Sequence, residues 1–126
     1  MKELAPTLLA LIDEISGLSG DRYREGGMFI QDFRFSDEAE IPVRDGISAD
    51  LEEIIEFFAF VLGGTTTDQV DRATSTATKF TRELENCYPH SKFHYAVETD
   101  GWSGDMEVWI LSDSYQIWFD LFWSID

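Results

Sequence analysis

The sequence contains little cysteine and few basic residues. Cys87 is the one cysteine among 126 residues, which excludes a framework of internal disulfides and favours a reducing compartment. Nine Lys and Arg stand against 25 Asp and Glu, so the formal net charge is −16 at pH 7. Such a charge repels nucleic acid and anionic membranes and attracts basic partners. No Lys or Arg follows Lys92, and segment 37–56 holds eight acids against Arg44 alone.

Long apolar runs are also missing. None approaches the roughly 20 residues that a membrane-spanning helix needs. Residues 1–3 lack the basic and apolar regions of a secretory signal, so we expect a cytoplasmic protein. The length suits one domain, and no repeat, low-complexity tract or linker divides it. Residues 1–126 are therefore predicted to form a single domain, whose core can draw on 14% aromatic residues.

Two segments in the first half of the chain have helical patterns. Apolar residues in segment 4–18 recur at the spacing of one helix face. Segment 49–62 follows Ser48, a candidate N-cap, and opens with acidic residues that favour a helix N-terminus. The second half of this segment is apolar on all sides, which predicts burial in the middle of the fold.

A third helix is predicted after Thr66, which can form a capping box with Gln69, and it ends before Pro89. Between the first two helices, residues 28–35 alternate as a strand does. Residues 36–46 lack a regular pattern. The helices thus occupy most of the first 90 residues, with one strand between them.

The last third of the chain predicts an antiparallel meander of three strands. Residues 106–123 alternate with period two about a two-residue turn at Asp113-Ser114. This turn places Ile110 opposite Ile117 and makes the inner pairs apolar on both sides.

The strand before it, 93–99, returns through loop 101–104, which would place Asp100 opposite Asp105. Helices and strands in separate runs argue for an α+β fold. The predicted order is α-β-α-α-β-β-β, with the C-terminal meander packed against the helices.

The outward face of this meander collects acids and tryptophans. The expected cross-strand rows are Glu98, Glu107 and Asp120, followed by Ala96, Trp109 and Trp118. Like charges directly opposite each other destabilise a sheet, so the acidic row has no folding rationale and marks a candidate site. The alternative is a solvated acidic face, with the tryptophans in a second small core beneath the first helix.

Trp102 lies at the predicted hairpin tip, where burial against its own chain is difficult; folding back on the hairpin is the alternative. Aromatic residues are enriched at interface centres, and the surrounding charge sets association rate and specificity. We therefore predict a surface that binds a basic protein partner. It comprises Glu98, Asp100, Trp102, Asp105, Glu107, Trp109, Trp118 and Asp120.

Catalytic and metal-binding patterns are weak. Cys87, His90 and His94 are spaced like metal ligands, but no second pair completes a structural zinc site. The acidic row lacks the ligand spacing of a Ca²⁺ loop. No P-loop, dinucleotide fingerprint or nucleophile elbow is present. We therefore expect neither an enzyme nor a bound cofactor or metal.

The chain, as a small, acidic, non-catalytic α+β protein, resembles bacterial toxin-immunity proteins in size, acidity and character. The resemblance implies a stoichiometric inhibitor that neutralises a basic, nuclease-type toxin by covering its active or nucleic-acid-binding surface. No residue role is carried over from that family. A DNA mimic that acts on a nuclease is a variant of the same hypothesis.

Two other classes stay open. An acidic secretion chaperone would form a stable dimer with exposed apolar grooves. A carboxylate-based hydrolase or metal-binding protein would use Glu107 and Asp120 chemically. The sequence leaves the oligomeric state open.

Overall fold

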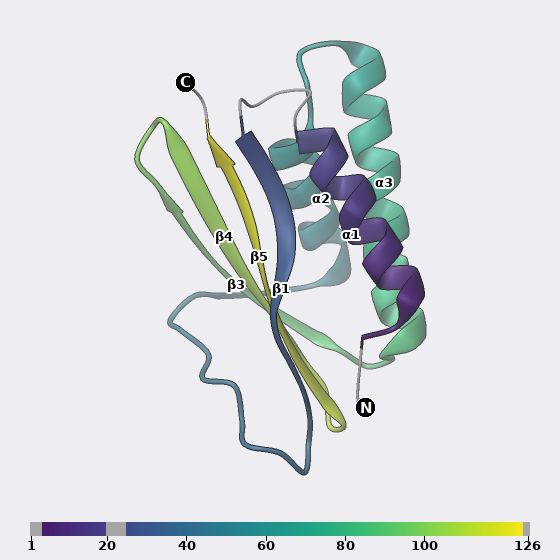
Figure 1. Ribbon diagram of the computed structural model, residues 1–126, viewed down its shortest axis with the longest axis vertical. Coiled ribbons are helices and arrows are strands. Elements are labelled where there is room, and N and C mark those ends of the chain that lie inside the picture. The colour runs from purple at the N-terminus through teal and green to yellow at the C-terminus, as the bar shows by residue number, and fades with distance from the viewer. Residues whose placement is uncertain (1–3, 20–24, 125–126) are drawn as a thin grey trace.

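In the computed structural model, which describes residues 4–19 and 25–124, three helices cover one face of a five-stranded antiparallel sheet (Figure 1). The helices are α1 (Pro6–Ser19), α2 (Leu51–Leu62) and α3 (Thr67–Cys87). The strands are β1 (Glu25–Phe35), β2 (Ile47–Ala49), β3 (Lys92–Thr99), β4 (Ser103–Leu111) and β5 (Tyr115–Ser124). Their order across the sheet is β1-β5-β4-β3-β2. The α+β prediction is confirmed.

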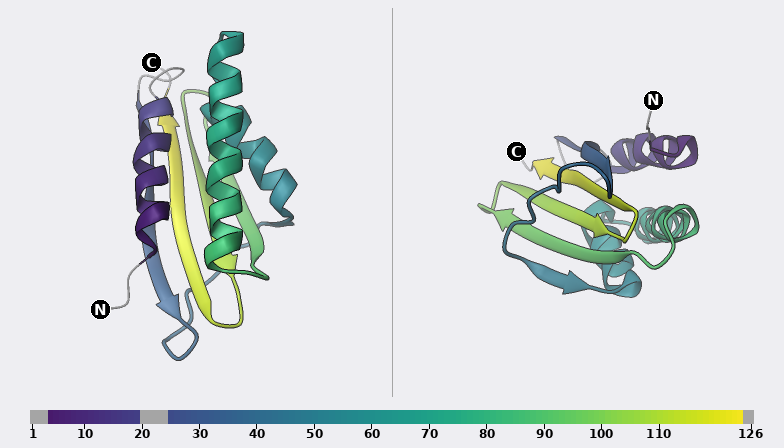
Figure 2. Two further views of the ribbon diagram at one scale, coloured as in Figure 1. Left: turned by 90° about the vertical axis from the view of Figure 1, so that its right-hand side faces the viewer. Right: turned by 90° about the horizontal axis from the view of Figure 1, so that it is seen from below.

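The centre of the helical layer is α3, which lies between α1 and α2 (Figure 2). Its buried side chains include Ala77, Phe80 and Leu84. The prediction that the second helix lies in the middle of the fold is wrong, because α2 flanks α3. The side of α2 that α3 and the sheet do not cover is solvent-exposed, and Phe60 on it is 68% exposed.

The N-terminus of α2 also differs from the prediction. Residues Ile47–Ala49 form β2 and pair with β3, so Ser48 belongs to a strand and is not the N-cap. The N-cap is Asp50, whose carboxylate accepts a 2.9 Å hydrogen bond from the Glu53 N–H. A three-residue strand carries too little alternation to be recognised in the sequence. The capping box predicted at the start of α3 is confirmed.

The predicted register of the last two strands is confirmed. Ile110 lies opposite Ile117, Val108 opposite Phe119, and Met106 opposite Leu121. All six side chains are at most 1% exposed. They face the helices and form the centre of the main core.

The predicted register between β3 and β4 is wrong by two residues. Glu98, rather than Asp100, lies opposite Asp105, because the hairpin closes in a tighter turn. The Asp100 N–H donates to the Ser103 carbonyl at 3.1 Å, and Gly101 takes a φ of +90° that favours glycine. A shift of two residues leaves every side chain on its predicted face but moves Glu98 by one row.

The face of the sheet away from the helices is partly covered by segment 36–46, which joins β1 to β2 (Figure 2). Ile41 in this segment is 3% exposed and packs against Ala96 and Trp109. Its N–H donates to Oε1 of Gln116 on β5 at 2.8 Å. The predicted alternative of a second small core is thus present, but segment 36–46 covers it instead of the first helix.

Candidate functional site

Two cross-strand pairs form the centre of the outward face. Glu107 on β4 lies directly opposite Asp120 on β5, and Trp109 lies opposite Trp118, as the sequence predicts. The third members of these rows differ, because the β3 register is shifted. Ala96, not Glu98, lies opposite Glu107.

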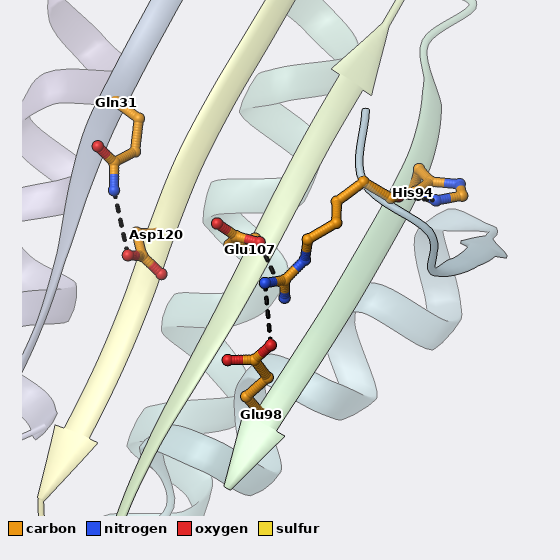
Figure 3. Close-up of polar contacts among 6 residues, drawn as sticks. Gln31, His94, Glu98, Glu107 and Asp120 are labelled. Carbon is orange, nitrogen blue, oxygen red and sulfur yellow. Dashed lines mark hydrogen bonds and ion pairs between the residues drawn. The ribbon is translucent and has the colours of Figure 1, made fainter. Parts of the chain in front are cut away.

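Asp120 is almost fully buried, with 7% of its surface exposed. The side-chain amide of Gln31 on β1 donates to its Oδ2 at 3.1 Å (Figure 3). Oδ1 receives no N–H or O–H from the described residues, but the Asp105 carboxyl lies within hydrogen-bonding reach. Because two carboxyls can share a hydrogen bond only if one is protonated, this pair favours a proton on Asp120.

The pKa of Asp120 is therefore raised to about 7. Burial is the largest cause, followed by the hydrogen bond and negative charge of Asp105, and the charge of Glu107 adds to them. The hydrogen bond from Gln31 acts in the opposite direction. Near neutral pH, Asp120 thus exists in both protonation states.

Glu107 is paired with Arg44, which reaches over from segment 36–46. The Arg44 guanidinium lies 3.0 Å from Oε2 of Glu107 and 3.0 Å from Oε1 of Glu98. Its contact with Glu107 is an ion pair without the alignment of a hydrogen bond. Burial raises the pKa of Glu107, Arg44 opposes this shift, and the nearby Asp105 and Glu98 carboxylates reinforce it.

Trp109 and Trp118 belong to the small core beneath Ile41. Their ring planes differ by only 4° and their centroids lie 6.3 Å apart, so the indoles are stacked. Trp109 is 1% exposed, and both indole N–H groups are buried without a hydrogen-bond partner in the described part of the chain. The interpretation of this pair as interface anchors stays a prediction. In this structure the indoles hold segment 36–46 on the sheet.

The β3–β4 hairpin carries the accessible part of the predicted surface. Trp102 at its end is 66% exposed, so the alternative that it folds back on its own hairpin is wrong. The Glu98 side chain is 72% exposed, Asp100 is exposed and Asp105 is half-buried. We call these four residues the acidic tip. The three acids of this set, Glu98, Asp100 and Asp105, border an open depression of about 870 Å³ at the end of the sheet.

Asp100 stabilises the hairpin turn of the acidic tip. Its carboxylate accepts hydrogen bonds from the backbone N–H groups of Ser103 at 2.7 Å and Trp102 at 2.9 Å. These two bonds hold the pKa of Asp100 below its usual value. They also fix the turn that presents the indole of Trp102 to solvent.

The structure brings two residues to this face that the sequence argument did not place there, Gln31 and Arg44. The position of Arg44 could have been suspected from the sequence, since it is the only basic residue in the acidic segment 37–56. The position of Gln31 could not be found from the sequence, because it depends on the pairing of β1 with β5 and on the bulge between Ile30 and Asp32.

Cys87, His90 and His94 do not form a common site. The Cys87 thiol contacts Glu83 at 3.4 Å, whereas Nε2 of His94 lies 3.1 Å from the Arg44 carbonyl oxygen. In residues 4–19 and 25–124, no three His, Cys, Asp or Glu side chains are arranged to hold a metal ion. None of the helices within these ranges is long and apolar enough to cross a membrane.

Comparison of the chain with protein-family models, with curated proteins and with solved structures gives no match.

Proposed function

We propose that this protein binds a basic protein partner through the acidic tip and thereby inhibits it. The observation that carries the proposal is the exposure of Trp102 on a turn that the Asp100 carboxylate holds, with Glu98 and Asp105 on the two strands that lead to it. An indole supplies a large contact area at low entropic cost, and aromatic anchors with a charged rim are typical of interface centres. The net charge of −16 would steer a basic partner toward such a surface.

The partner class that suits this chemistry is a basic enzyme that acts on nucleic acid. Carboxylates on a protruding hairpin can occupy a surface that otherwise holds phosphates, and the indole can take the place of a stacked base. This supports an immunity protein that neutralises a nuclease-type toxin. A DNA mimic directed at another nuclease would use the same residues.

The first experiment is a tagged pull-down from the source cell, washed at low and at high salt, with the captured protein identified and purified. We expect one basic protein, captured near one-to-one, whose activity falls in proportion to added inhibitor. Its association rate should fall as salt is raised, because the attraction is electrostatic. Capture of an apolar secreted substrate by a dimer would support the secretion chaperone instead.

Trp102→Ala should weaken binding of the purified partner by about 30-fold or more, as expected for an aromatic hot spot. Its matched control is Leu9→Ala, which removes an exposed apolar side chain (45% exposed) from α1 in the opposite layer. The two dissociation constants can be measured by biolayer interferometry. Wild-type affinity for Trp102→Ala would show that the acidic tip is not the binding surface.

One observation favours a second function, hydrolysis by a carboxyl pair. The Asp105 carboxyl lies within hydrogen-bonding reach of Asp120, and a pKa of about 7 suits Asp120 as a general acid. Under this alternative, Asp120→Asn and Glu107→Gln would each abolish turnover while the fold is retained. Under inhibition, both variants keep their inhibitory activity, because neither residue belongs to the acidic tip.

A further inference from the structure

The outer part of β3 is an open edge of the sheet. β2 pairs with β3 only over three residues, and its first pair is Ile47 with Tyr95. β3 continues to Thr99 and stays paired with β4 on its other side. No strand among the described residues lies against the 96–99 stretch from the β2 side. This stretch forms the left margin of the sheet in Figure 1.

The hydrogen bonds of the hairpin show which backbone groups point to this edge. The Asp100 N–H donates across to Ser103 on the β4 side. Because hydrogen-bonded pairs alternate along an antiparallel ladder, Glu98 also directs its N–H and C=O toward β4. Val97 and Thr99 then direct theirs away from β4, as Tyr95 does where it meets β2. Two N–H and two C=O groups are thus available at the open edge.

The other edge strands, β1 and β2, are less regular or shorter. On β1, the Ser16 hydroxyl of α1 accepts a hydrogen bond from the Met28 N–H at 3.1 Å and lies 3.3 Å from the Met28 carbonyl. A bulge between Ile30 and Asp32 further interrupts that strand. β2 offers only three residues. Unprotected edges attract foreign strands, and nothing in residues 4–19 and 25–124 interrupts the edge at Val97 and Thr99 in this way, so this stretch is the candidate for pairing with another strand.

The two sides of the open edge differ in chemistry. On the helical side, Val97 is 37% and Ile47 57% exposed. On the opposite side lie the Glu98 carboxylate, which Arg44 contacts at 3.0 Å, and the acids Asp100 and Asp105. Residues of 44–47 and 95–98 line a groove of about 470 Å³ between them.

Gly46 explains where this groove begins. A Cβ at this position would lie 2.3 Å from the Tyr95 carbonyl oxygen, so the chain approaches β3 closely there. Beyond this point segment 36–46 leaves the edge, and Arg44 crosses to the outward face to reach Glu107. The open edge therefore starts directly after Tyr95.

We propose that an extended segment of the basic partner adds to the sheet at this edge, as a strand in which Lys or Arg alternates with apolar residues. Its cations would face Glu98 and Asp105, and its apolar side chains would face Val97 and Ile47. Backbone pairing with Val97 and Thr99 supplies the attachment, and the alternation supplies the specificity. This inference rests on the proposed function, since it names how the same partner is held beside the acidic tip.

The test uses two short capped peptides of identical composition. In one, Lys and Val alternate; in the other, the lysines precede the valines. The alternating peptide should bind at least about tenfold more tightly, because only its strand form matches both sides of the edge. Amide hydrogen exchange followed by NMR should show that this peptide slows exchange at Val97 and Thr99. The Glu98 amide, which is directed at β4, should be protected with and without peptide.

A backbone variant isolates the hydrogen bond. Thr99→Pro removes an N–H from the open edge and should weaken the alternating peptide about five- to tenfold, the effect of one lost hydrogen bond. Thr99→Val keeps the N–H and should bind as the wild type does. If Thr99→Pro disturbs the hairpin, the exchange measurement on the wild-type protein still decides the question.

The outcomes separate this inference from the proposed function. Equal binding of the two peptides, or protection at β1 instead of β3, would overturn strand addition and leave an electrostatic acidic surface intact. If neither peptide binds while the natural partner is captured and Trp102→Ala releases it, strand addition is again overturned and the proposed function stands. If the peptides bind as expected but no basic partner is inhibited, the edge is a binding site and inhibition is refuted.

Discussion

Asp120→Asn should raise the free energy of unfolding at about pH 8 by up to about 4 kcal/mol, which corresponds to the pKa displacement of this carboxyl. The side chain titrates near 3.9 in an unfolded chain but at about 7 in the folded protein. Between these values the folded state binds more protons than the unfolded state. The contribution of Asp120 to the free energy of unfolding is thus fully present below about pH 4 and is lost as the pH rises through 7.

Asparagine stays neutral throughout this range and can still accept the hydrogen bond from Gln31. The stability of Asp120→Asn should therefore depend much less on pH between about 4 and 8 than that of the wild type. Urea unfolding at several pH values measures the difference. The control is Asp113→Asn, which removes an exposed carboxylate from the β4–β5 turn. If both variants keep the wild-type slope, Asp120 is not the carboxyl that titrates with folding.

Trp109→Ala should lower the free energy of unfolding by about 3–5 kcal/mol, because it removes the largest fully buried side chain. It would leave Trp118 without its stacking partner and Ile41 without support, so segment 36–46 should loosen. Trp102→Ala should change stability by no more than about 0.5 kcal/mol, since that indole is mostly exposed.

Guanidinium unfolding followed by circular dichroism compares the two variants without relying on tryptophan fluorescence. The pair also separates the two roles of tryptophan on this sheet. A loss of equal size for both variants would contradict the assignment of Trp109 to the interior and Trp102 to the surface.

Much of the sheet could be predicted because the pattern of β4 and β5 admits one register. A slip of β5 by one residue relative to β4 would have turned Ile117 and Phe119 to the outside. The Asp113-Ser114 turn fixed the remaining choice. The direct opposition of Glu107 and Asp120, and of Trp109 and Trp118, followed from that register alone.

The rest depends on contacts between distant parts of the chain. The observed cross-strand partner of Glu98 differs from the predicted one because Gly101 permits a tighter hairpin than the predicted loop of four residues. The cover over Trp109 came from Ile41, whose segment has no regular pattern. The face that the sequence predicts to be exposed throughout therefore contains two environments. One is a largely buried centre of carboxyl and indole side chains, and the other is the acidic tip.

This division separates the residues of the predicted partner-binding surface into a buried set and an accessible set. Four of the predicted residues support the sheet and segment 36–46: Glu107, Trp109, Trp118 and Asp120. The other four form the acidic tip, in which Asp105 is half-buried and Glu98, Asp100 and Trp102 are exposed. In the proposed function, the net charge of −16 would act at a distance and steer a basic partner toward the acidic tip.

The most direct test of the central claim is site-specific photocrosslinking in the source cell. A photoreactive phenylalanine analogue would replace Trp102 in one variant and Leu9 in another. We expect the analogue at position 102 to crosslink to one basic protein, which the analogue at position 9 does not capture. Crosslinking of that protein from position 9 alone, with none from position 102, would contradict the assignment of the binding surface to the acidic tip.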